Sequence, residues 1–298
     1  MAPSSSTPAS RTAVELATQP DCWRRAAARP AFSPAPGERI AVTGCGTSWF
    51  MAQAYAALRE SSGQGETDAF ASSEFPAGRR YDRLVGITRS GTTTEVLRAL
   101  DAVRGRIPTV AITADAATPV RDAADEVVVL DWADEQSVVQ TRFATTALAY
   151  LRAGLGEDMT AAAADAETAV ASALPAAALE AEQWTFLGTG WTYGLAQEAA
   201  LKMREAAGAW TEAYPAMEYR HGPIAVARPG RVVWAFGPLP AGLAEDVTAT
   251  GATLVTAGGG DPMADLVRVH RLAVAVAERR GLSPDAPRNL TRSVILAP

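Results

Sequence analysis

The chain has 298 residues, of which 48% are hydrophobic and 20% charged, a composition typical of a globular protein with one large domain or two of ordinary size. Its net charge of −6 argues against a general nucleic-acid or membrane-surface binder, because such proteins need a basic face. Two cysteines, two histidines and the lack of an apolar run of about 18 residues argue against a disulfide framework, a metal centre and a membrane span.

The first segment predicts a disordered tail over residues 1–12, because Met1–Ser10 is rich in Pro, Ser and Ala and has no apolar core. The same composition excludes a signal peptide, so we expect a cytoplasmic protein. A helix is expected over residues 13–28, interrupted at the Gln19-Pro20 step.

From Arg39 onward, short apolar strands alternate with helices. Strands are expected at Ile40–Thr43, Leu84–Thr88, Thr109–Thr113 and Val127–Leu130, with helices after the first two and over Val138–Leu151. This rhythm is typical of right-handed βαβ crossovers and a mostly parallel sheet. It predicts a doubly wound α/β unit over residues 13–158.

An alanine-rich stretch, residues 159–183, predicts a helical connector, after which the alternation restarts in a second, shorter unit over residues 184–298. Its strands are expected at Thr185–Leu187, Val232–Phe236 and Thr253–Thr256, with helices up to about Ala207 and over Ala264–Arg280. The restart indicates an internal duplication with a constant offset of 144 residues. The matching positions are Gly44, Gly46, Ala52 and Gln53 in the first unit and Gly188, Gly190, Ala196 and Gln197 in the second.

The turn after the first strand, Gly44–Ser48, is a candidate anion site. Its glycines let backbone N–H groups approach an anion, and the following helix adds the positive end of its dipole. Thr47 and Ser48 add hydroxyl donors. A tight strand-to-helix turn with a Thr or Ser cap is an equally good interpretation of this motif alone.

A second candidate is the loop Thr88–Glu95, which follows the next strand. In an open α/β sheet, ligands bind at this carboxyl edge. Hydroxyls of Thr88, Ser90 and Thr93 and the backbone around Gly91 would form a nest for phosphate. Neither a nucleotide P-loop nor a dinucleotide fingerprint is present, so no nucleotide cofactor is expected. A Ser/Thr-rich helix cap is the alternative interpretation.

A third candidate is the helix that carries Glu198, Lys202 and Glu205. Spacings of four and three residues place these side chains on one helix face. A surface ion pair is the alternative, but the residues between them leave no purely polar outer face. Buried beside a cleft, the carboxylates would have shifted pKa values and could act as acid or base.

A fourth candidate is His221, one of only two histidines, which lies between acidic residues and a Gly-Pro turn. A lone histidine is more often a hydrogen-bonded structural residue. At this position it could instead protonate a ring oxygen near neutral pH.

Taken together, these motifs resemble the SIS (sugar isomerase) domain family. The segments that carry the resemblance, in the order found in the family, are Gly44–Ser48, Thr88–Glu95, Glu198–Glu205, Glu218–Pro223 and Pro287–Val294. The similarity is strongest to the isomerase half of glucosamine-6-phosphate synthase and its stand-alone relatives, and it extends from about Glu15 onward. It implies two tandem, flavodoxin-like SIS units.

The resemblance also implies roles for individual residues. The residues expected to hold the sugar phosphate are Gly46, Thr47, Ser48, Thr88, Ser90, Gly91 and Thr93, with Gln140 and Arg292 also at the site. Glu205 would be the base that moves a proton between C1 and C2, with Glu198 and Lys202 as catalytic partners. His221 would assist ring opening by reaching across the interface of a homodimer.

Three departures from the family pattern bear on the chemistry. Thr88 replaces a serine and keeps its hydroxyl, whereas Gln140 and Arg142 replace a serine and a lysine. Arg292 replaces the lysine that forms an imine with the open-chain sugar, and a guanidinium forms no imine. The segment before residue 40 holds no glutaminase domain, so we expect no ammonia from glutamine.

We therefore expect an enzyme that removes the C2 proton of a hexose or hexosamine 6-phosphate, without a metal or other cofactor. The enediol that results can be reprotonated, can lose ammonia by way of an imine, or can expel the C3 hydroxyl, and the residues leave these outcomes open. The alternative is a non-catalytic, sugar-phosphate-binding regulator. Against it, the N-terminal segment is too short for a helix-turn-helix domain, and Glu205 and His221 favour chemistry.

Overall fold

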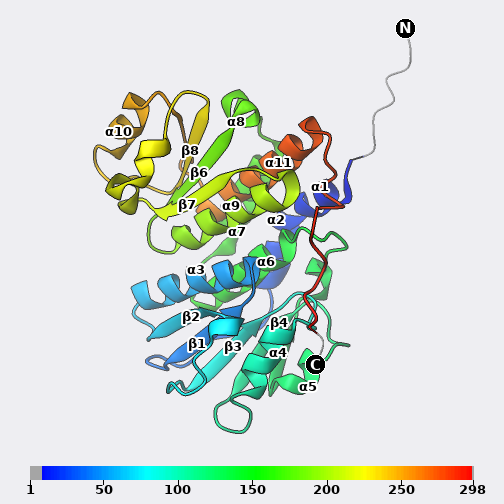
Figure 1. Cartoon of the computed structure of the whole chain (residues 1–298). Coiled ribbons are helices and arrows are strands. Elements are labelled where there is room, and N and C mark those ends of the chain that lie inside the picture. Colours follow the sequence, from blue (N-terminus) through cyan, green and yellow to red (C-terminus); the bar gives the residue numbers. More distant parts are fainter. Residues whose placement is uncertain (1–8, 297–298) are drawn as a thin grey trace, which may run out of the picture.

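The computed structural model describes residues 9–296, which form two parallel β-sheets with a layer of helices between them (Figure 1). The first sheet contains β1 (Ile40–Gly44), β2 (Thr67–Ala71), β3 (Arg83–Ile87), β4 (Thr109–Thr113) and β5 (Glu126–Val129). The second contains β6 (Gln183–Gly188), β7 (Thr211–Pro215), β8 (Arg231–Phe236) and β9 (Thr253–Thr256). The prediction of an α/β protein with two tandem parallel-sheet units is confirmed.

The strand order is the same in both sheets. The first follows β2-β1-β3-β4-β5, which is the flavodoxin-like order, and the second follows β7-β6-β8-β9. Every neighbouring pair is parallel. The second unit is therefore a repeat of the first that stops one strand earlier.

Helices cover both faces of each sheet. They are α1 (Arg11–Leu16), α2 (Gln19–Ala27), α3 (Thr47–Ser61), α4 (Thr94–Asp101), α5 (Val120–Ala123), α6 (Arg142–Gly154), α7 (Met159–Ala171), α8 (Ala176–Glu180), α9 (Thr192–Ala207), α10 (Leu243–Ala249) and α11 (Pro262–Arg279). Between the sheets, α2, α3, α6, α7, α9 and α11 pack against one another (Figure 1). The outer face of the first sheet is covered by α4 and α5, and that of the second by α10.

One hydrophobic core joins the two units. Side chains from the inner faces of both sheets, such as Val85 and Ile112 in the first and Phe186 and Trp234 in the second, belong to the same buried cluster. The outer face of each sheet has a smaller cluster of its own. Because burial of apolar area is the main stabilising term, this shared core fixes the two units relative to each other.

The crossing of α3 and α9 bears out the offset of 144 residues in the three-dimensional structure. Gln53 and Gln197, which correspond to each other in the two halves, are hydrogen-bonded across this crossing. A Cβ atom at Gly194 would lie 2.5 Å from the carbonyl oxygen of Phe50, so a glycine is needed for the close approach of the two helices. The two helices thus meet near a local twofold axis.

The two strands that the sequence pattern did not predict are β2 and β7. Each lies at the edge of its sheet and is only half-buried for most of its length. An edge strand has no continuous apolar run because one side faces solvent, so its periodicity is weak. Pro215 at the end of β7 is tolerated for the same reason.

The expected N-terminal helix is two helices, because Pro20 occupies the first turn of α2. Of the predicted tail, residues 1–8 lie outside the described residues. Arg11 and Thr12 belong to α1 rather than to a tail, and their backbone N–H groups donate to the Asp285 carboxylate at 2.7 and 2.8 Å. The helix expected from Val138 begins only at Arg142.

The proposed connector, residues 159–183, contains α7 and α8, and α7 contributes buried alanines to the shared core. The boundaries at residues 158 and 184 stay predictions. After α11 the chain has no regular structure up to residue 296, and this segment runs back from the second unit to the first, where it passes α4 (Figure 1).

Candidate active site

The candidate site lies where β1 and β3 diverge at their carboxyl ends. This is the topological switch point of the first sheet, because the chain leaves β1 toward α3 on one side and β3 toward α4 on the other. A cavity of about 210 Å³ opens there. Its lining includes Gly46, Thr47, Ser48, Thr88, Arg89, Ser90, Thr93, Val138, Gln140, Glu205, Arg292 and Ser293.

The glycine turn forms one wall of the cavity. At Gly44 a Cβ atom would lie 2.8 Å from the backbone of Ser48, and Gly46 has a φ of 53°, so this tight turn requires glycine at both positions. The turn delivers Thr47 and Ser48 as the first residues of α3, where the free N–H groups and the helix dipole favour an anion. Gln140 accepts a hydrogen bond from the Ser48 hydroxyl at 3.5 Å.

The loop after β3 forms the second wall. Gly91 has a φ of 63°, and a Cβ atom there would lie 2.0 Å from the Thr118 hydroxyl, so only glycine fits. The Ser90 hydroxyl accepts from the Thr92 backbone N–H at 3.2 Å. The Thr88 hydroxyl is buried without a hydrogen-bond partner among the described residues. This hydroxyl is therefore free to donate a hydrogen bond to a bound ligand.

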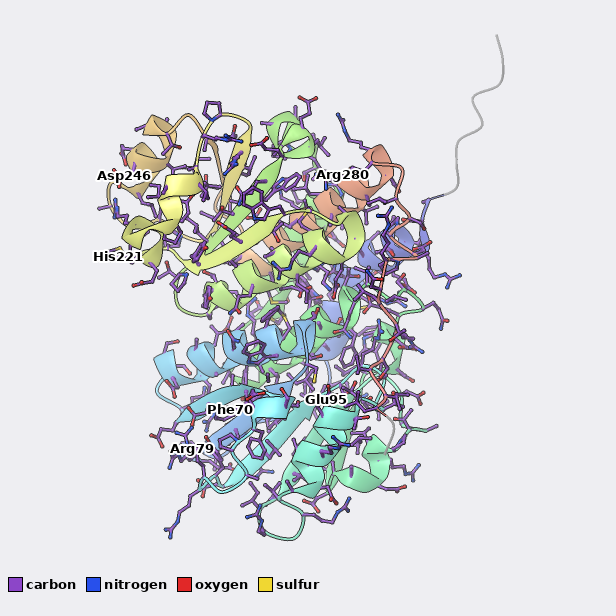
Figure 2. The ribbon with its side chains drawn as sticks, in the orientation of Figure 1. Phe70, Arg79, Glu95, His221, Asp246 and Arg280 are labelled. Atoms are coloured by element: carbon purple, nitrogen blue, oxygen red, sulfur yellow. The ribbon has the colours of Figure 1, made fainter. Side chains whose placement is uncertain are left out.

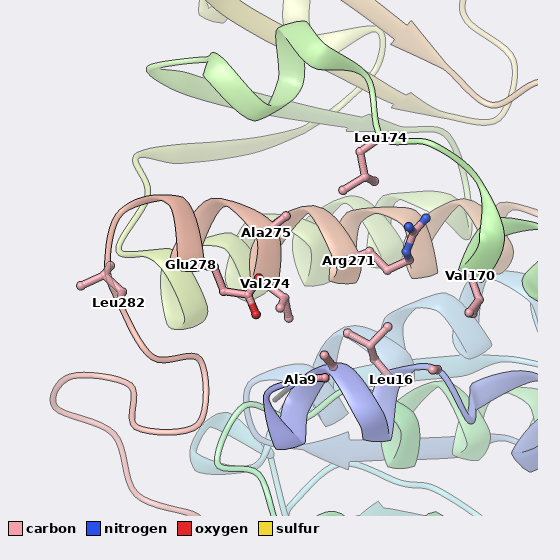
Figure 3. A pocket seen from close by; sticks show the side chains of 11 residues that line it. Ala9, Leu16, Val170, Leu174, Arg271, Val274, Ala275, Glu278 and Leu282 are labelled. Atoms are coloured by element: carbon pink, nitrogen blue, oxygen red, sulfur yellow. The ribbon is translucent and has the colours of Figure 1, made fainter. Parts of the chain in front are cut away.

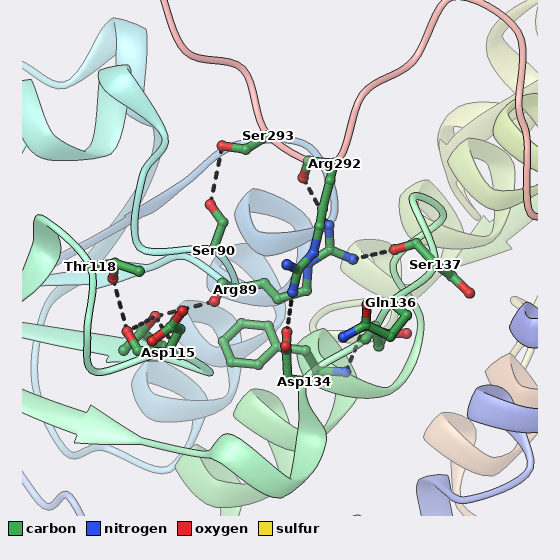
Figure 4. A network of polar contacts seen from close by, with 12 residues as sticks. Arg89, Ser90, Asp115, Thr118, Asp134, Gln136, Ser137, Arg292 and Ser293 are labelled. Atoms are coloured by element: carbon green, nitrogen blue, oxygen red, sulfur yellow. Dashed lines mark hydrogen bonds and ion pairs between the residues drawn. The ribbon is translucent and has the colours of Figure 1, made fainter.

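The C-terminal segment lines the cavity on a further side, and its residues Arg292 and Ser293 contact the loop after β3 (Figure 4). The Ser293 hydroxyl contacts the hydroxyls of Ser90 at 3.1 Å and Thr92 at 2.9 Å. The Arg292 guanidinium pairs with Asp134 at 2.5 Å. Because Arg292 is held by a carboxylate, its positive charge stays at the rim of the cavity.

Arg89 joins this segment to the first unit (Figure 4). Its side chain is only 3% exposed and donates to the backbone oxygens of Ser137 at 2.9 Å and Arg292 at 2.8 Å. Burial lowers the pKa of Arg89. Arg89 is not part of any ion pair among the described residues, although the charges of Glu135, Asp134 and Glu15 act on it from a distance. The sequence motifs gave no indication of this role.

The position of Gln140 depends on a buried carboxylate, Glu135. Its oxygens accept from the backbone N–H groups of Thr141, Arg142 and Phe143 at 2.7, 2.9 and 3.1 Å. These bonds cap the start of α6 and explain why the helix begins later than predicted. The preceding loop, which includes Gln140, is thereby held against the cavity.

The charged residues of α9 approach the same cavity from the second unit. Glu205 lines the cavity and is paired with the ammonium of Lys202. On the other side of Lys202, Glu198 lies 3.6 Å away. Glu198 and Lys202 are 0% and 1% exposed, so the three side chains are not a surface ion pair.

Burial sets the electrostatics of this trio. It raises the pKa of Glu198 to about 7, with Lys202 only partly opposing the shift. Burial of Lys202 acts to lower its own pKa, but the carboxylates of Glu198 and Glu205 outweigh it and raise that pKa. Lys202 is also the only lysine in the chain.

A buried histidine that the motifs did not single out stands behind Glu198. The Nε2 atom of His270, on α11, lies 3.5 Å from Oε1 of Glu198. Burial lowers the pKa of His270 to about 3, so its ring is neutral. In the sequence, His270 lies on an amphipathic helix next to Arg271, and this pattern carries no indication of a site.

His221 is the predicted catalytic residue that lies neither in the lining of the cavity nor in the charged trio of α9. It is exposed and ends a 3-10 turn, Glu218–His221, in the second unit. Figure 2 shows His221 well away from Glu95, the last residue of the loop after β3. The prediction that His221 acts in a second copy of the chain stays a prediction.

A larger hollow of about 770 Å³ lies between α1, α7 and α11 (Figure 3). Its lining is mostly Ala, Val and Leu, and its one arginine, Arg271, already donates to the backbone oxygens of Ala169 and Ser172. It therefore lacks the converging polar groups of a catalytic site.

Within residues 9–296, no helix combines the length and the hydropathy needed to span a membrane. The same residues contain no cluster of acidic, His or Cys side chains that could hold a metal ion.

Comparison with known proteins gives consistent results. Residues 35–153 match the family model described as SIS domain. A curated relative, a glutamine–fructose-6-phosphate aminotransferase (isomerizing) from Methanothermobacter thermautotrophicus, is 30% identical over 86% of this chain and 51% of its own length. The chain thus spans about half the length of this relative.

Solved structures share the fold. A glucosamine-6-phosphate deaminase from Thermotoga maritima has a TM-score of 0.83 at 24% identity and covers 96% of this chain and 100% of its own. A tagatose-6-phosphate ketose/aldose isomerase from Escherichia coli has a TM-score of 0.76 at 18% identity and covers 98% and 99%. At these identities the likeness shows the fold alone.

Proposed function

The chain is a SIS domain protein, and from this premise we propose that it is an enzyme acting on a phosphorylated hexose or hexosamine, with Glu205 as the base that removes the proton from C2. The observation that carries the proposal is the convergence of two kinds of group on one cavity. The first unit supplies hydroxyls and a helix N-terminus, and the second supplies a carboxylate paired with a buried ammonium.

The phosphate end of the substrate is assigned to the wall formed by the two loops. Ser48, Ser90 and Thr93 offer hydroxyl donors, and α3 offers backbone N–H groups at its N-terminus. The buried charge of Arg89 nearby favours a dianion over a neutral group. An unphosphorylated sugar would leave these donors without a matching acceptor.

The reacting end is assigned to Glu205. Its carboxylate would accept the C2 proton, the electron pair of the C–H bond would form the C1–C2 double bond, and the carbonyl electron pair would move to O1 to give an enediolate. Return of the proton to C1, with transfer of the hydroxyl proton from O2 to O1, completes isomerisation to a ketose. If C2 carries an amine, the same transfer gives a 2-imine, which water hydrolyses to the ketose and ammonia.

Arg292 favours proton transfer over amino transfer. A Schiff base with the substrate needs a neutral amine, and the guanidinium of Arg292 cannot supply one. The only lysine, Lys202, is buried and paired with Glu205. Isomerisation or deamination is therefore the favoured outcome, and the names of the two solved structures with this fold are consistent with it.

The site is completed, in this proposal, by His221 of a second copy. In its own chain this residue is exposed and away from the cavity, so a role in ring opening requires a homodimer.

A ¹H NMR time course in D₂O tests the proposal. The purified protein is incubated separately with glucosamine 6-phosphate, N-acetylglucosamine 6-phosphate and fructose 6-phosphate, beside a Glu205→Gln variant. We expect one substrate to be converted with deuterium entering from the solvent, and the variant to lose this conversion. Saturable binding of all three without conversion would contradict the proposal and favour a sugar-phosphate-binding regulator.

A further inference from the structure

The ring of His270 and the carboxylate of Glu198 face each other in the interior, 3.5 Å apart. Neither His270 Nε2 nor either carboxylate oxygen of Glu198 makes a hydrogen bond among the described residues, so the 3.5 Å between them is a close contact and not yet a hydrogen bond. Both side chains are at most 1% exposed. A buried carboxylate is costly without a donor, and besides the ammonium of Lys202 the groups placed to supply one are the His270 ring and the Thr47 hydroxyl.

The hydrogen bonds of Gln19 determine which ring nitrogen of His270 carries the proton. The amide nitrogen of Gln19 lies 3.0 Å from the carbonyl oxygen of Leu16. Because a carbonyl oxygen only accepts, the atom facing it must be the amide nitrogen. That nitrogen also lies 3.3 Å from Nδ1 of His270. Nδ1 of the neutral ring is therefore the acceptor, and Nε2 carries the hydrogen.

The orientation of Gln19 has a second support. Its amide oxygen accepts from the hydroxyl of Thr145 at 2.8 Å, and this hydroxyl in turn accepts from the indole N–H of Trp23 at 3.1 Å. The whole chain of contacts is buried. The Nε2–H of His270 is thus aimed at Glu198 by residues of α2 and α6, outside the candidate site itself.

Lys202 lies between two carboxylates and binds Glu205 more closely than Glu198. It is bound to Glu205 and lies 3.6 Å from Glu198. A negative charge on Glu198 draws the ammonium away from Glu205, whereas a neutral Glu198 leaves the ammonium to Glu205 alone. The charge state of Glu198 therefore affects how closely Lys202 pairs with Glu205.

We propose that His270, through its Nε2–H, is a positioning residue that keeps Glu198 in place as a second counter-ion of Lys202, so that Lys202 is shared between Glu198 and Glu205. The role of Glu205 as base rests on the proposed function. His270 contacts no reacting atom and acts on the base through two intervening side chains.

Two charged residues besides Glu198, Lys202 and Glu205 influence this buried group. Glu135, before α6, and Arg204, on α9 itself, are the further charges that act on the pKa values of His270 and Glu198. Burial raises the pKa of Glu198 to about 7, so at neutral pH its charge depends on small contributions such as one donated hydrogen bond. Loss of a donor beside Glu198 would favour its protonated form.

Two selectively labelled samples test the geometry without any substrate. The chain has two histidines and one lysine, so ¹⁵N-histidine and ¹³C-lysine labelling give very few side-chain signals, and a His221→Asn variant assigns the ring signals. We expect a neutral Nε2–H tautomer for His270 between pH 5 and 8. We expect the Lys202 signal to move in the same direction in His270→Leu and Glu198→Gln, and to stay near the wild-type position in His270→Gln.

Kinetics test the consequence for the base. His270→Leu keeps the volume without a donor, whereas His270→Gln keeps an N–H near the position of Nε2. For His270→Leu we expect kcat to fall about tenfold, KM to stay within about twofold, and the acid limb of kcat/KM to move about one unit lower. His270→Gln should recover most of both effects. The substrate phosphate also ionises near pH 6 and contributes to the acid limb in every variant. The quantity to compare is therefore the difference in the acid limb between each variant and the wild type.

The double variant His270→Leu/Glu198→Gln distinguishes this role from a merely structural one. If His270 acts through Glu198, its loss should change kcat less than about twofold when Glu198 is already neutral. Additive effects, an unmoved acid limb, or a ring protonated on Nδ1 would overturn the proposal. If the wild type converts no substrate, the proposed function fails, and the two NMR results alone decide whether His270 positions Glu198.

Discussion

The two units have the same turn at the same place, but only the turn of the first unit lines the candidate cavity. In the first, Thr47 and Ser48 face a cavity and the next loop adds further hydroxyls. In the second, the Thr192 hydroxyl is already used within its own turn and by the Phe236 carbonyl oxygen at 2.9 Å. The loop after β8 contains Gly237, two prolines and no hydroxyl residue before Pro240. The two turns thus share their backbone conformation, but only the first leaves its hydroxyl groups available to a ligand.

The central helices differ in the same way. Since α3 and α9 cross in opposite directions, the N-terminal end of each lies beside the C-terminal end of the other. The offset of 144 residues relates Glu198, Lys202 and Glu205 to Ala54, Leu58 and Ser61. The charged trio of the second unit thus faces the turn of the first, and the turn of the second unit faces no such trio. The candidate site belongs to the pairing of the units rather than to either one.

The largest expected effect is on the base. Glu205→Gln should lower kcat by about a thousandfold, which is the usual contribution of a general base, with little change in KM. Ser61→Ala, at the corresponding position of α3, is the matched control and should change kcat less than about twofold. Steady-state kinetics with the substrate found by NMR measure both. A similar loss in the two variants would contradict the division between the units.

A large effect on stability is expected from the turns, and here the units should behave alike. A Cβ atom would lie 2.8 Å from backbone atoms at Gly44 and 2.3 Å from the Thr192 carbonyl oxygen at Gly188. Replacement by alanine should lower the free energy of unfolding by about 3 kcal/mol in each case. Only Gly44→Ala should also weaken sugar-phosphate binding. Denaturant titration and calorimetry separate the two effects, and weakened binding in Gly188→Ala would argue for a second site.

A smaller effect is expected from a single hydroxyl. Ser90→Ala removes one donor to the phosphate and should raise KM about tenfold, because a hydrogen bond to a charged group contributes about 1.5–3 kcal/mol. Thr189→Ala, in the turn of the second unit, is the control and should leave KM within about twofold. An unchanged KM in Ser90→Ala would remove the loop after β3 from the phosphate site.

The smallest effect is expected in a trapping experiment, in which the wild-type chain should form no covalent adduct with the sugar. Borohydride added during turnover should trap no sugar on the wild-type chain, because Lys202 is buried and its raised pKa keeps it protonated. Arg292→Lys places an amine at the rim of the cavity and should give a trapped adduct by mass spectrometry. An adduct on Lys202 in the wild type would indicate imine chemistry.

The sequence predicted the parts of the fold that follow a local pattern. The buried strands next to the glycine turns and the helix carrying Glu205 have clear apolar runs, and the structure has them close to the expected residues. The edge strands β2 and β7 were not predicted because their half-buried, polar residues resemble loops.

The candidate site was predictable only where its residues belong to one motif. Gln140, Ser90 and Glu205 were expected and line one cavity. The pairing of His270 with Glu198 was not, because 72 residues separate them and only the packing of α9 against α11 brings them together. The role of Arg89 was not predictable either, because its partners Ser137 and Arg292 are distant from it in the sequence.

The only lysine of this chain is 1% exposed, and the other 26 basic side chains are arginines. Since a guanidinium stays charged up to about pH 12, the positive charge that the arginine side chains give the surface does not titrate in the mildly alkaline range. Reagents that acylate or alkylate lysine would likewise find no lysine side chain on the surface of the folded protein. An amine-reactive label that does attach to Lys202 therefore reports opening of the core around it.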